Sequence, residues 1–106
     1  DFTHVSDIAS GGVAATDRAA NAALPLEPVY NLGNNKPVKL FDFIAAIEKA
    51  AGRTSLKQFK PKPAGDVTIT YADISLAERD LGFTPTTTIE AGMTDFVEWF
   101  KSYKAA

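Results

Sequence analysis

The sequence predicts a small α/β fold, or an α+β-like piece of one, in which a few short strands join the helices. Apolar residues recur at helical spacing over 40–51 and 89–100, and short β-branched or aromatic runs lie between the helices. The strands are too short and too few to form a closed sheet, so we expect them to extend a sheet located elsewhere. The length of 106 residues suits one small domain with a modest core, and we expect a single domain over 1–106.

Composition and charge exclude several classes of protein. Hydrophobic residues make up 45% of the chain, and seven Phe, three Tyr and one Trp need somewhere to pack, so we expect an ordered globular chain. The formal net charge of -2 gives no reason to expect nucleic acid as a partner, and no apolar run approaches the ~20 residues of a membrane helix. The absence of Cys excludes thiolate metal sites and fits a reducing cytoplasm, and a lone His4 argues against a zinc site.

The first predicted elements are a short strand at 2–5 and the helix that follows it. Ser6 or Asp7 offers an N-cap, because its side-chain oxygen can accept a hydrogen bond from a free amide of the first turn. We expect the helix to run from residue 7 to about 20 although it contains a Gly-Gly pair at 11–12, and each Gly costs ~1 kcal/mol relative to Ala. That cost predicts close packing of this helix against a sheet or a second domain.

The middle of the chain predicts a loop, a strand and a second helix. Residues 21–27 form the loop, 29–32 the strand, and the Gly-Asn-Asn sequence at 33–35 has turn chemistry. A helix follows at 40–51, and Gly52 stands where a left-handed cap would end it. The apolar face of this helix consists of Leu40, Phe43, Ile44, Ile47 and Ala51.

The segment after this helix predicts mainly extended and irregular backbone. Residues 55–60 alternate loosely between apolar and polar side chains and are interpreted as a strand. Two prolines interrupt 61–66, so this stretch cannot form regular structure. Residues 67–71 are rich in β-branched side chains and are expected to be extended.

Two further helices complete the prediction. Asp73 is expected to cap a short helix at 74–81, which Gly82 ends. Thr87 or Thr88 is expected to start the last helix, with a glutamate two or three residues on, as in a capping box. Its predicted buried stripe consists of Ile89, Met93, Phe96, Val97 and Phe100, and a second aromatic pair consists of Trp99 and Tyr103.

The sequence contains no self-contained active site. The Gly-Gly pair at 11–12 lies inside a predicted helix, so it is not the glycine-rich phosphate loop of a dinucleotide fingerprint. His4 is the only His, and we interpret it as a packed or hydrogen-bonded strand residue rather than a catalytic base. Asp7 and Asp73 each precede a helix and are interpreted as N-caps, whereas the role of Asp1 stays open.

Asp66 is the strongest candidate for a ligand contact. It follows Gly65 in a proline-bound loop that also contains Lys62. A Gly lets the backbone approach a ligand closely, and an Asp carboxylate can accept hydrogen bonds from two sugar hydroxyls. A Gly-Asp turn in a surface loop explains the pair equally well, so both interpretations stand.

Five short motifs occur in an order that resembles a known family. They are Asp1-Phe2-Thr3-His4-Val5-Ser6-Asp7, Val29-Tyr30-Asn31-Leu32-Gly33-Asn34, Gly65-Asp66-Val67, Ala72-Asp73-Ile74-Ser75-Leu76-Ala77 and Leu81-Gly82-Phe83-Thr84-Pro85. Together they resemble the C-terminal part of the extended short-chain dehydrogenases/reductases, and most closely the UDP-glucuronate 4-epimerases. The UDP-galactose 4-epimerases are near relatives in this resemblance.

The resemblance implies a full-length protein about three times as long, in which a Rossmann half binds NAD. A catalytic Tyr-x-x-x-Lys motif would also lie in that half. This motif is absent here, because Asn34 follows Tyr30 at the fourth position and Ser75 follows Tyr71. The resemblance therefore implies that these residues form the lobe that binds the nucleotide sugar, which would not catalyse alone.

The resemblance also assigns expected roles to single residues. An Arg that contacts the diphosphate in such epimerases would directly precede Asp1, and a second phosphate-binding Arg or Gln position is occupied here by Pro63. Lys62 could replace it only as a point charge, without the bidentate geometry of Arg. Asp66 matches the Asp that holds the ribose hydroxyls, and Asn31 matches an Asn at a strand end that we interpret as structural.

The expected function is binding of a UDP-sugar within an NAD-dependent epimerase that converts UDP-glucuronate to UDP-galacturonate. The resemblance implies a cytoplasmic full-length enzyme, with no membrane partner, that dimerises mostly through helices of its Rossmann half. Two alternatives stay open. The chain could be a stand-alone binding or structural module without activity, or the equivalent lobe of a UDP-galactose 4-epimerase, a sugar-nucleotide dehydratase or a reductase.

Overall fold

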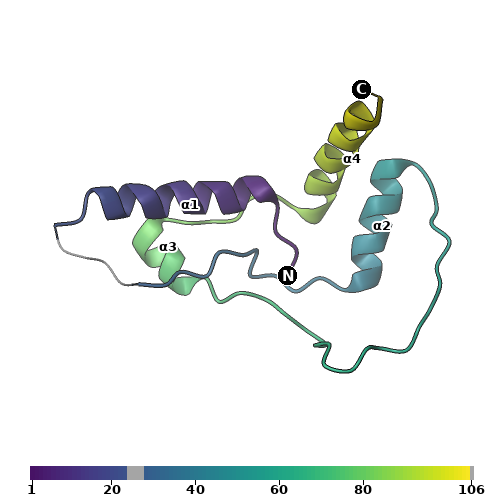
Figure 1. The fold of residues 1–106 in the computed structure, drawn as a ribbon, viewed down its shortest axis with the longest axis horizontal. Coiled ribbons are helices and arrows are strands. Elements are labelled where there is room, and N and C mark those ends of the chain that lie inside the picture. Colours follow the sequence, from purple (N-terminus) through teal and green to yellow (C-terminus); the bar gives the residue numbers. More distant parts are fainter. Residues whose placement is uncertain (24–27, 106) are drawn as a thin grey trace.

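Four helices form the regular structure of the chain. The computed structural model describes residues 1–23 and 28–105, and its helices are α1 (Val5–Ala20), α2 (Leu40–Ala51), α3 (Ser75–Leu81) and α4 (Ile89–Ala105). Figure 1 shows α1 beside α3, α2 beside α4, and a long extended segment that runs from α2 to α3. The loop predicted at 21–27 lies partly outside the described residues, because 24–27 are not among them.

The prediction of an α/β fold is confirmed only in its helices. No strand is present in the described residues, so the strands predicted at 2–5, 29–32 and 55–60 are wrong as strands. A strand needs a hydrogen-bonding neighbour, and these segments form no ladder; the last residue of the first, Val5, already lies in α1. Leu56 is fully exposed, and Ser55 and Lys57 contact α2 only through the Glu48 side chain.

Helix α1 begins earlier than predicted because His4 caps it. The Nδ1 atom of His4 accepts a hydrogen bond from the backbone N–H of Ser6 at 3.3 Å, which satisfies one free amide of the first turn. The predicted caps Ser6 and Asp7 are therefore wrong, since both lie within the first turn. His4 is hydrogen-bonded, as expected, but as a helix cap rather than as a strand residue.

The two adjacent glycines of α1 have different neighbours. A Cβ atom on Gly11 would lie 2.8 Å from the methyl groups of Leu32 and 3.0 Å from the ring of Phe83. A Cβ atom on Gly12 would meet nothing within 4 Å. A close approach is therefore present at Gly11 and absent at Gly12, and it is made to Leu32 and Phe83 of the same chain rather than to the predicted sheet or second domain.

The predicted ends of the other helices are largely confirmed. Helix α2 has the predicted bounds, and Gly52 ends it with φ 67°, which is left-handed. Gly82 ends α3 in the same way with φ 62°. The predicted start of α3 is wrong by one residue, because Ile74 rather than Asp73 occupies the cap position, although the Asp73 carboxylate accepts from the N–H of Ser75 at 3.0 Å. The hydroxyl of Thr88 accepts from the N–H of Ala91 at 3.2 Å and so caps α4. The third helical position is therefore Ala91 and not the glutamate of a capping box.

The hydrophobic core lies between α1 and α3. Ile74, Ala77 and Phe83 are buried there, and four partly buried side chains pack against them: Tyr30, Leu32, Ala72 and Leu81. The predicted buried faces of α2 and α4 are confirmed only in part: six of their ten members are half-buried, and Leu40, Ile47, Phe96 and Phe100 are exposed. Leu40 is 62% exposed and Phe96 is 51% exposed, and the only buried apolar residue in either helix is Ala46 on α2.

The Asp7 carboxylate joins the two helix pairs. Asp7 is 5% exposed, and its oxygens accept hydrogen bonds from the backbone N–H groups of Thr86 at 3.3 Å and Thr87 at 3.0 Å. Burial raises the pKa of Asp7, but the hydrogen bonds from Thr87 and Thr86 outweigh it and leave this pKa below its ordinary value. The start of α1 is thus fixed beside the segment that enters α4. Within the described residues, no helix is long and apolar enough to cross a membrane.

Candidate functional site

The three predicted site residues lie together on one exposed turn. The N–H of Asp66 donates to the carbonyl of Pro63 at 3.3 Å, and Gly65 between them has φ 85°. A positive φ at the third position is the requirement of a type II turn, and Gly meets it without strain. Lys62 lies at the start of this turn, and its Nζ atom donates to the hydroxyl of Thr68 at 3.0 Å.

The turn presents the Asp66 carboxylate to solvent. Asp66 Oδ1 accepts from the N–H of the next residue, Val67, at 2.9 Å. Within the described part of the chain, no hydrogen bond reaches the other carboxylate oxygen of Asp66. The carboxylate is therefore held by the turn and has one oxygen available for a hydroxyl donor. Both sequence interpretations of the Gly65-Asp66 pair are compatible with this geometry.

Asp1 organises a second polar cluster, which the sequence left open. Its Oδ2 atom accepts from the N–H groups of Ala72 at 2.8 Å and Asn35 at 3.2 Å. Its Oδ1 atom accepts from the N–H of Asn34 at 3.0 Å and the hydroxyl of Thr3 at 3.3 Å. One carboxylate thus joins the N-terminal segment, the turn at 33–35 and the segment that leads back from the Asp66 turn.

Two neighbouring contacts strengthen this junction. A Cβ on Gly33 would lie 2.7 Å from the Cβ of Ala72 and 3.0 Å from Asp1 Oδ2, so only Gly allows the approach. The side-chain amide of Asn31 donates to the carbonyl of Asp73 at 3.3 Å, in line with its predicted structural role. In the sequence, the one sign of this junction was the Gly-Asn-Asn turn at 33–35, whose backbone N–H groups need an acceptor such as the Asp1 carboxylate.

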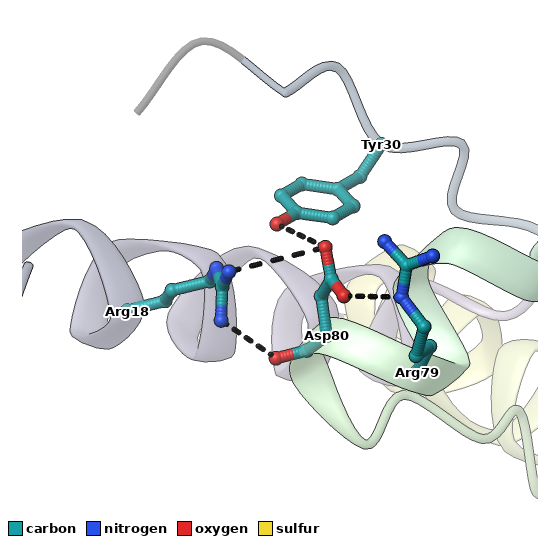
Figure 2. Close-up of polar contacts among 4 residues, drawn as sticks. All are labelled: Arg18, Tyr30, Arg79 and Asp80. Atoms are coloured by element: carbon teal, nitrogen blue, oxygen red, sulfur yellow. Dashed lines mark hydrogen bonds and ion pairs between the residues drawn. The ribbon is translucent and has the colours of Figure 1, made fainter. Parts of the chain in front are cut away.

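Asp80 holds a third polar cluster, shown in Figure 2, that the sequence did not predict. Its carboxylate accepts from Arg79 Nε at 2.7 Å and from the hydroxyl of Tyr30 at 3.2 Å, and Arg18 lies 3.9 Å away. The hydrogen bond from Arg79 lowers the pKa of Asp80, and burial opposes it only in part. Arg18 also donates to the Asp80 carbonyl at 3.4 Å. The cluster joins α1, the 29–32 segment and α3, so its role is structural.

An apolar groove lies between the N-terminal residues 1–5 and the 87–99 segment at the start of α4, with Phe43 as the lining residue from α2. It has a volume of about 710 Å³, and none of Lys62, Gly65 and Asp66 lines it. Its titratable lining residues are Asp1, His4 and Asp95. The Asp1 carboxylate accepts four hydrogen bonds. His4 caps α1, and its Nδ1 atom lies 2.7 Å from the hydroxyl oxygen of Ser6, which does not line the groove. Among residues 1–23 and 28–105, no group of three or more His, Asp or Glu side chains could hold a metal ion.

Comparison with known proteins places this arrangement within larger enzymes. No family model matches the chain. UDP-glucuronate 4-epimerase 4 of Arabidopsis thaliana is 38% identical to it over 97% of this chain and 26% of the plant protein. The chain spans about a quarter to a third of the length of the curated relatives that it matches.

Solved structures give the same answer for the fold. UDP-glucose 4-epimerase from Bifidobacterium longum, in complex with NAD+ and UDP, matches with a TM-score of 0.84 and 35% identity over 98% of this chain and 30% of its own. UDP-glucuronic acid 4-epimerase from Bacillus cereus, in complex with NAD and UDP-4-deoxy-4-fluoro-glucuronic acid, matches with a TM-score of 0.83 and 29% identity. That match covers 97% of this chain and 32% of the bacterial enzyme.

The helices and turns described above are therefore those of a part of the extended short-chain dehydrogenases/reductases. Within that class, the chain is homologous to a segment of the NAD-dependent nucleotide-sugar epimerases, which include UDP-glucuronate and UDP-glucose 4-epimerases. The predicted resemblance is confirmed at this level.

Proposed function

We propose that the chain is the substrate-binding C-terminal portion of an NAD-dependent epimerase that interconverts UDP-glucuronate and UDP-galacturonate. The observation that carries this proposal is the 38% identity to a UDP-glucuronate 4-epimerase over 97% of the chain. A solved UDP-glucuronic acid 4-epimerase that binds a UDP-sugar analogue supports it at the level of structure. We also propose a cytoplasmic, homodimeric full-length enzyme.

The Asp66 turn is the part of the chain that we assign to the nucleotide. A carboxylate with one oxygen engaged in the turn and one free can accept hydrogen bonds from ribose hydroxyls. Lys62 lies on the same turn and can place a positive charge near a diphosphate. Gly65 keeps the backbone at this point free of a side chain, which leaves room for a ligand.

The described residues do not fit NAD. Their Gly-Gly pair lies inside α1, where its amides already form the helix, and no glycine-rich loop stands between a strand and a helix in residues 1–23 and 28–105. The sequence also has no Tyr-x-x-x-Lys motif. The redox step therefore belongs to the rest of the proposed enzyme. Incubation of this chain with NAD and UDP-glucuronate should give no UDP-galacturonate, and detectable product would refute the assignment.

Binding of UDP is the direct test of the Asp66 turn. Titration with UDP, followed by NMR, should move the amide signals of Lys62, Gly65 and Asp66 before those of other residues. Asp66→Asn should weaken this binding about tenfold, since a hydrogen bond to a charged group contributes about 1.5–3 kcal/mol. Asp17→Asn, an exposed Asp on α1, is the matched control and should leave UDP binding unchanged.

A second candidate rests on the Bifidobacterium longum structure. Its TM-score of 0.84 and 35% identity favour the equivalent portion of a UDP-glucose 4-epimerase, which would use the same nucleotide turn. The two candidates share UDP and differ only in the sugar. If millimolar UDP moves no signal in the 62–66 turn, the turn does not bind nucleotide and the chain is a folded module with an incomplete site.

A further inference from the structure

Lys62 and Thr68 lie on either side of the Asp66 turn and contact each other. The Nζ atom of Lys62 donates a hydrogen bond to the hydroxyl of Thr68 at 3.0 Å, and both residues are exposed. Within the turn, the N–H of Asp66 donates to the carbonyl of Pro63 at 3.3 Å. The contact between Lys62 and Thr68 is therefore a second bridge, which joins the segment that enters the turn to the segment that leaves it.

The two opposite charges of this part of the chain do not pair with each other. Asp66 Oδ1 accepts from the N–H of Val67 at 2.9 Å. Among the residues that the structure describes, no ion pair joins Lys62 to Asp66 or to another acidic side chain. Opposite charges so near in the sequence attract each other even in water. Each of them is instead held by a neutral partner, the carboxylate by a backbone N–H and the ammonium by a hydroxyl.

A neutral partner leaves the charge of Lys62 available to a ligand. An ammonium group has three N–H donors, and Lys62 uses one of them on Thr68, so two remain for acceptors outside the chain. The hydroxyl of Thr68 carries no charge and does not neutralise the ammonium group. A lysine that is already held also loses less side-chain entropy when it binds a ligand.

This separation of charge suits a nucleoside diphosphate. Such a ligand has hydroxyl donors on its ribose and anionic oxygens on its phosphates, so it needs an acceptor and a cation at separate points. Asp66 offers the acceptor and Lys62 the cation. The space beside Gly65 is open, because a Cβ atom there would meet nothing within 4 Å. An ion pair between Lys62 and Asp66 would occupy both groups and remove this selectivity.

We propose that Thr68 is a positioning residue for nucleotide recognition. Its hydroxyl holds the Lys62 ammonium group apart from Asp66, so that Lys62 binds the phosphate groups of UDP while Asp66 binds the ribose hydroxyls. This inference rests on the proposed binding of UDP by the Asp66 turn. It adds that the contribution of the phosphates to affinity depends on Thr68, which acts through Lys62.

The test separates the phosphate part of binding from the nucleoside part. The dissociation constants of uridine and UDP are measured by NMR titration of the amide signals of Gly65 and Asp66, and their ratio reports what the phosphates contribute. We expect UDP to bind about tenfold more tightly than uridine, as for one hydrogen bond to a charged group. Thr68→Val removes the hydroxyl and keeps the shape of the side chain, so it should lower this ratio about threefold and leave the affinity for uridine unchanged.

Two threonine variants control for the loss of the hydroxyl. Thr68→Ser keeps a hydroxyl at the same position and should retain the wild-type ratio. Thr16→Val is the matched control, because Thr16 is exposed on α1 and its hydroxyl donates to the carbonyl of Gly12 at 2.9 Å. It should leave both affinities unchanged.

Two lysine variants separate a positioned charge from the charge of the whole segment. Lys62→Met should make the affinities for uridine and UDP nearly equal. Lys60 is exposed in the same segment and makes no hydrogen bond within the described part of the chain. Lys60→Met should change the ratio little, because an exposed charge that is not held near the ligand is screened by salt.

A measurement without ligand tests the contact itself. The ¹³C relaxation of the Lys62 Cε methylene reports how freely the side chain moves on the picosecond-to-nanosecond timescale. The methylene should be more ordered in the wild type and in Thr68→Ser than in Thr68→Val. Equal order in the wild type and in Thr68→Val would overturn the proposal.

Three binding results would overturn the proposal while the proposed function stands. The first is a ratio unchanged in Thr68→Val, and the second is a ratio that Lys60→Met lowers as much as Lys62→Met does. The third is an affinity for uridine that falls as much as that for UDP in Thr68→Val, since Thr68 would then shape the whole turn. If the wild type binds neither uridine nor UDP, the proposed function fails together with this inference, and the wild type alone reveals that outcome.

Discussion

The α1/α3 half and the α2/α4 half of the molecule are held together in different ways. The α1/α3 half buries Ile74, Ala77 and Phe83 and closes around the Asp80 cluster. The α2/α4 half makes the more extensive contact between helices, yet its aromatic side chains stay half exposed. The first half therefore carries its own core, whereas the second leaves its largest apolar side chains in contact with solvent.

The two halves show that extensive contact between helices does not by itself bury their apolar side chains. Two helices can pack along their length and still leave their largest side chains on the outer face, as Phe96 and Trp99 do on α4. The free energy of burial is gained only when water is excluded, so the second half gains little of it alone. Substitutions in the two halves should consequently differ in cost.

The largest expected effect is the loss of Phe83. Phe83 is 3% exposed, and Phe83→Ala should lower the free energy of unfolding by about 3 kcal/mol, since a cavity replaces a core ring. Phe96→Ala is the matched change in the other half and should cost about 1 kcal/mol, mainly from lost ring contacts. Urea unfolding measures both, and equal costs would show that the two halves are equally complete.

The next effect concerns Asp7, which joins the halves. Asp7→Ala leaves the N–H groups of Thr86 and Thr87 without their acceptor and should cost about 2 kcal/mol. Because the folded pKa of Asp7 is lowered, its stabilisation is present above its ordinary value and is lost as the pH falls through the folded pKa. The free energy of unfolding of the wild type should thus fall below about pH 4, and less steeply for Asp7→Asn. Identical pH profiles for the two proteins would contradict this role.

A smaller effect compares two adjacent glycines on α1. Gly11→Ala places a methyl group 2.8 Å from Leu32 and should destabilise the chain by about 1 kcal/mol, after the gain in helix propensity. Gly12→Ala meets nothing within 4 Å and should stabilise it by up to about 1 kcal/mol. Thermal unfolding of the two variants should move in opposite directions. A shift in the same direction would mean that α1 does not pack against the 29–33 segment.

The smallest effect lies at the exposed end of α2. Glu48 Oε1 accepts from Lys57 at 2.6 Å and from the N–H and hydroxyl of Ser55 at 2.8 and 2.6 Å, and these contacts lower the pKa of Glu48 to about 2. The contacts are therefore complete above the ordinary pKa of 4.5 and are lost as the pH falls toward 2. The amide signal of Ser55 should titrate near pH 2, and not in Glu48→Gln. A midpoint near 4.5 would show that the 55–57 segment is detached from α2.

The sequence predicted local features well and long-range ones poorly. Helix α2 and its Gly52 cap, the end of α3 at Gly82 and the turn at Gly65 all depend on neighbouring residues, and these predictions were confirmed. A strand forms only beside a partner segment, and an apolar helix face is buried only where another segment covers it. Helical spacing therefore identified the apolar faces of α2 and α4 but not whether they are covered. The junctions at Asp1 and Asp80 join residues far apart in the sequence, so no local sequence pattern predicts them.

The polar junctions also bear on the order in which the chain folds. Asp7 contacts Thr87 across 80 residues, and Asp1 contacts Ala72 across 71. Closing a loop of that length costs about 4 kcal/mol of chain entropy before any contact forms. The packing of Gly11 against Phe83 closes a loop of similar length, and once it has formed, both junctions join segments that already lie close together. Both junctions should then form after the helix pairs, so that their loss speeds unfolding and leaves the folding rate nearly unchanged. The hydrogen bonds of Asp1 and Asp7 should thus determine the unfolding rate, and so the lifetime of the native state, rather than the folding rate.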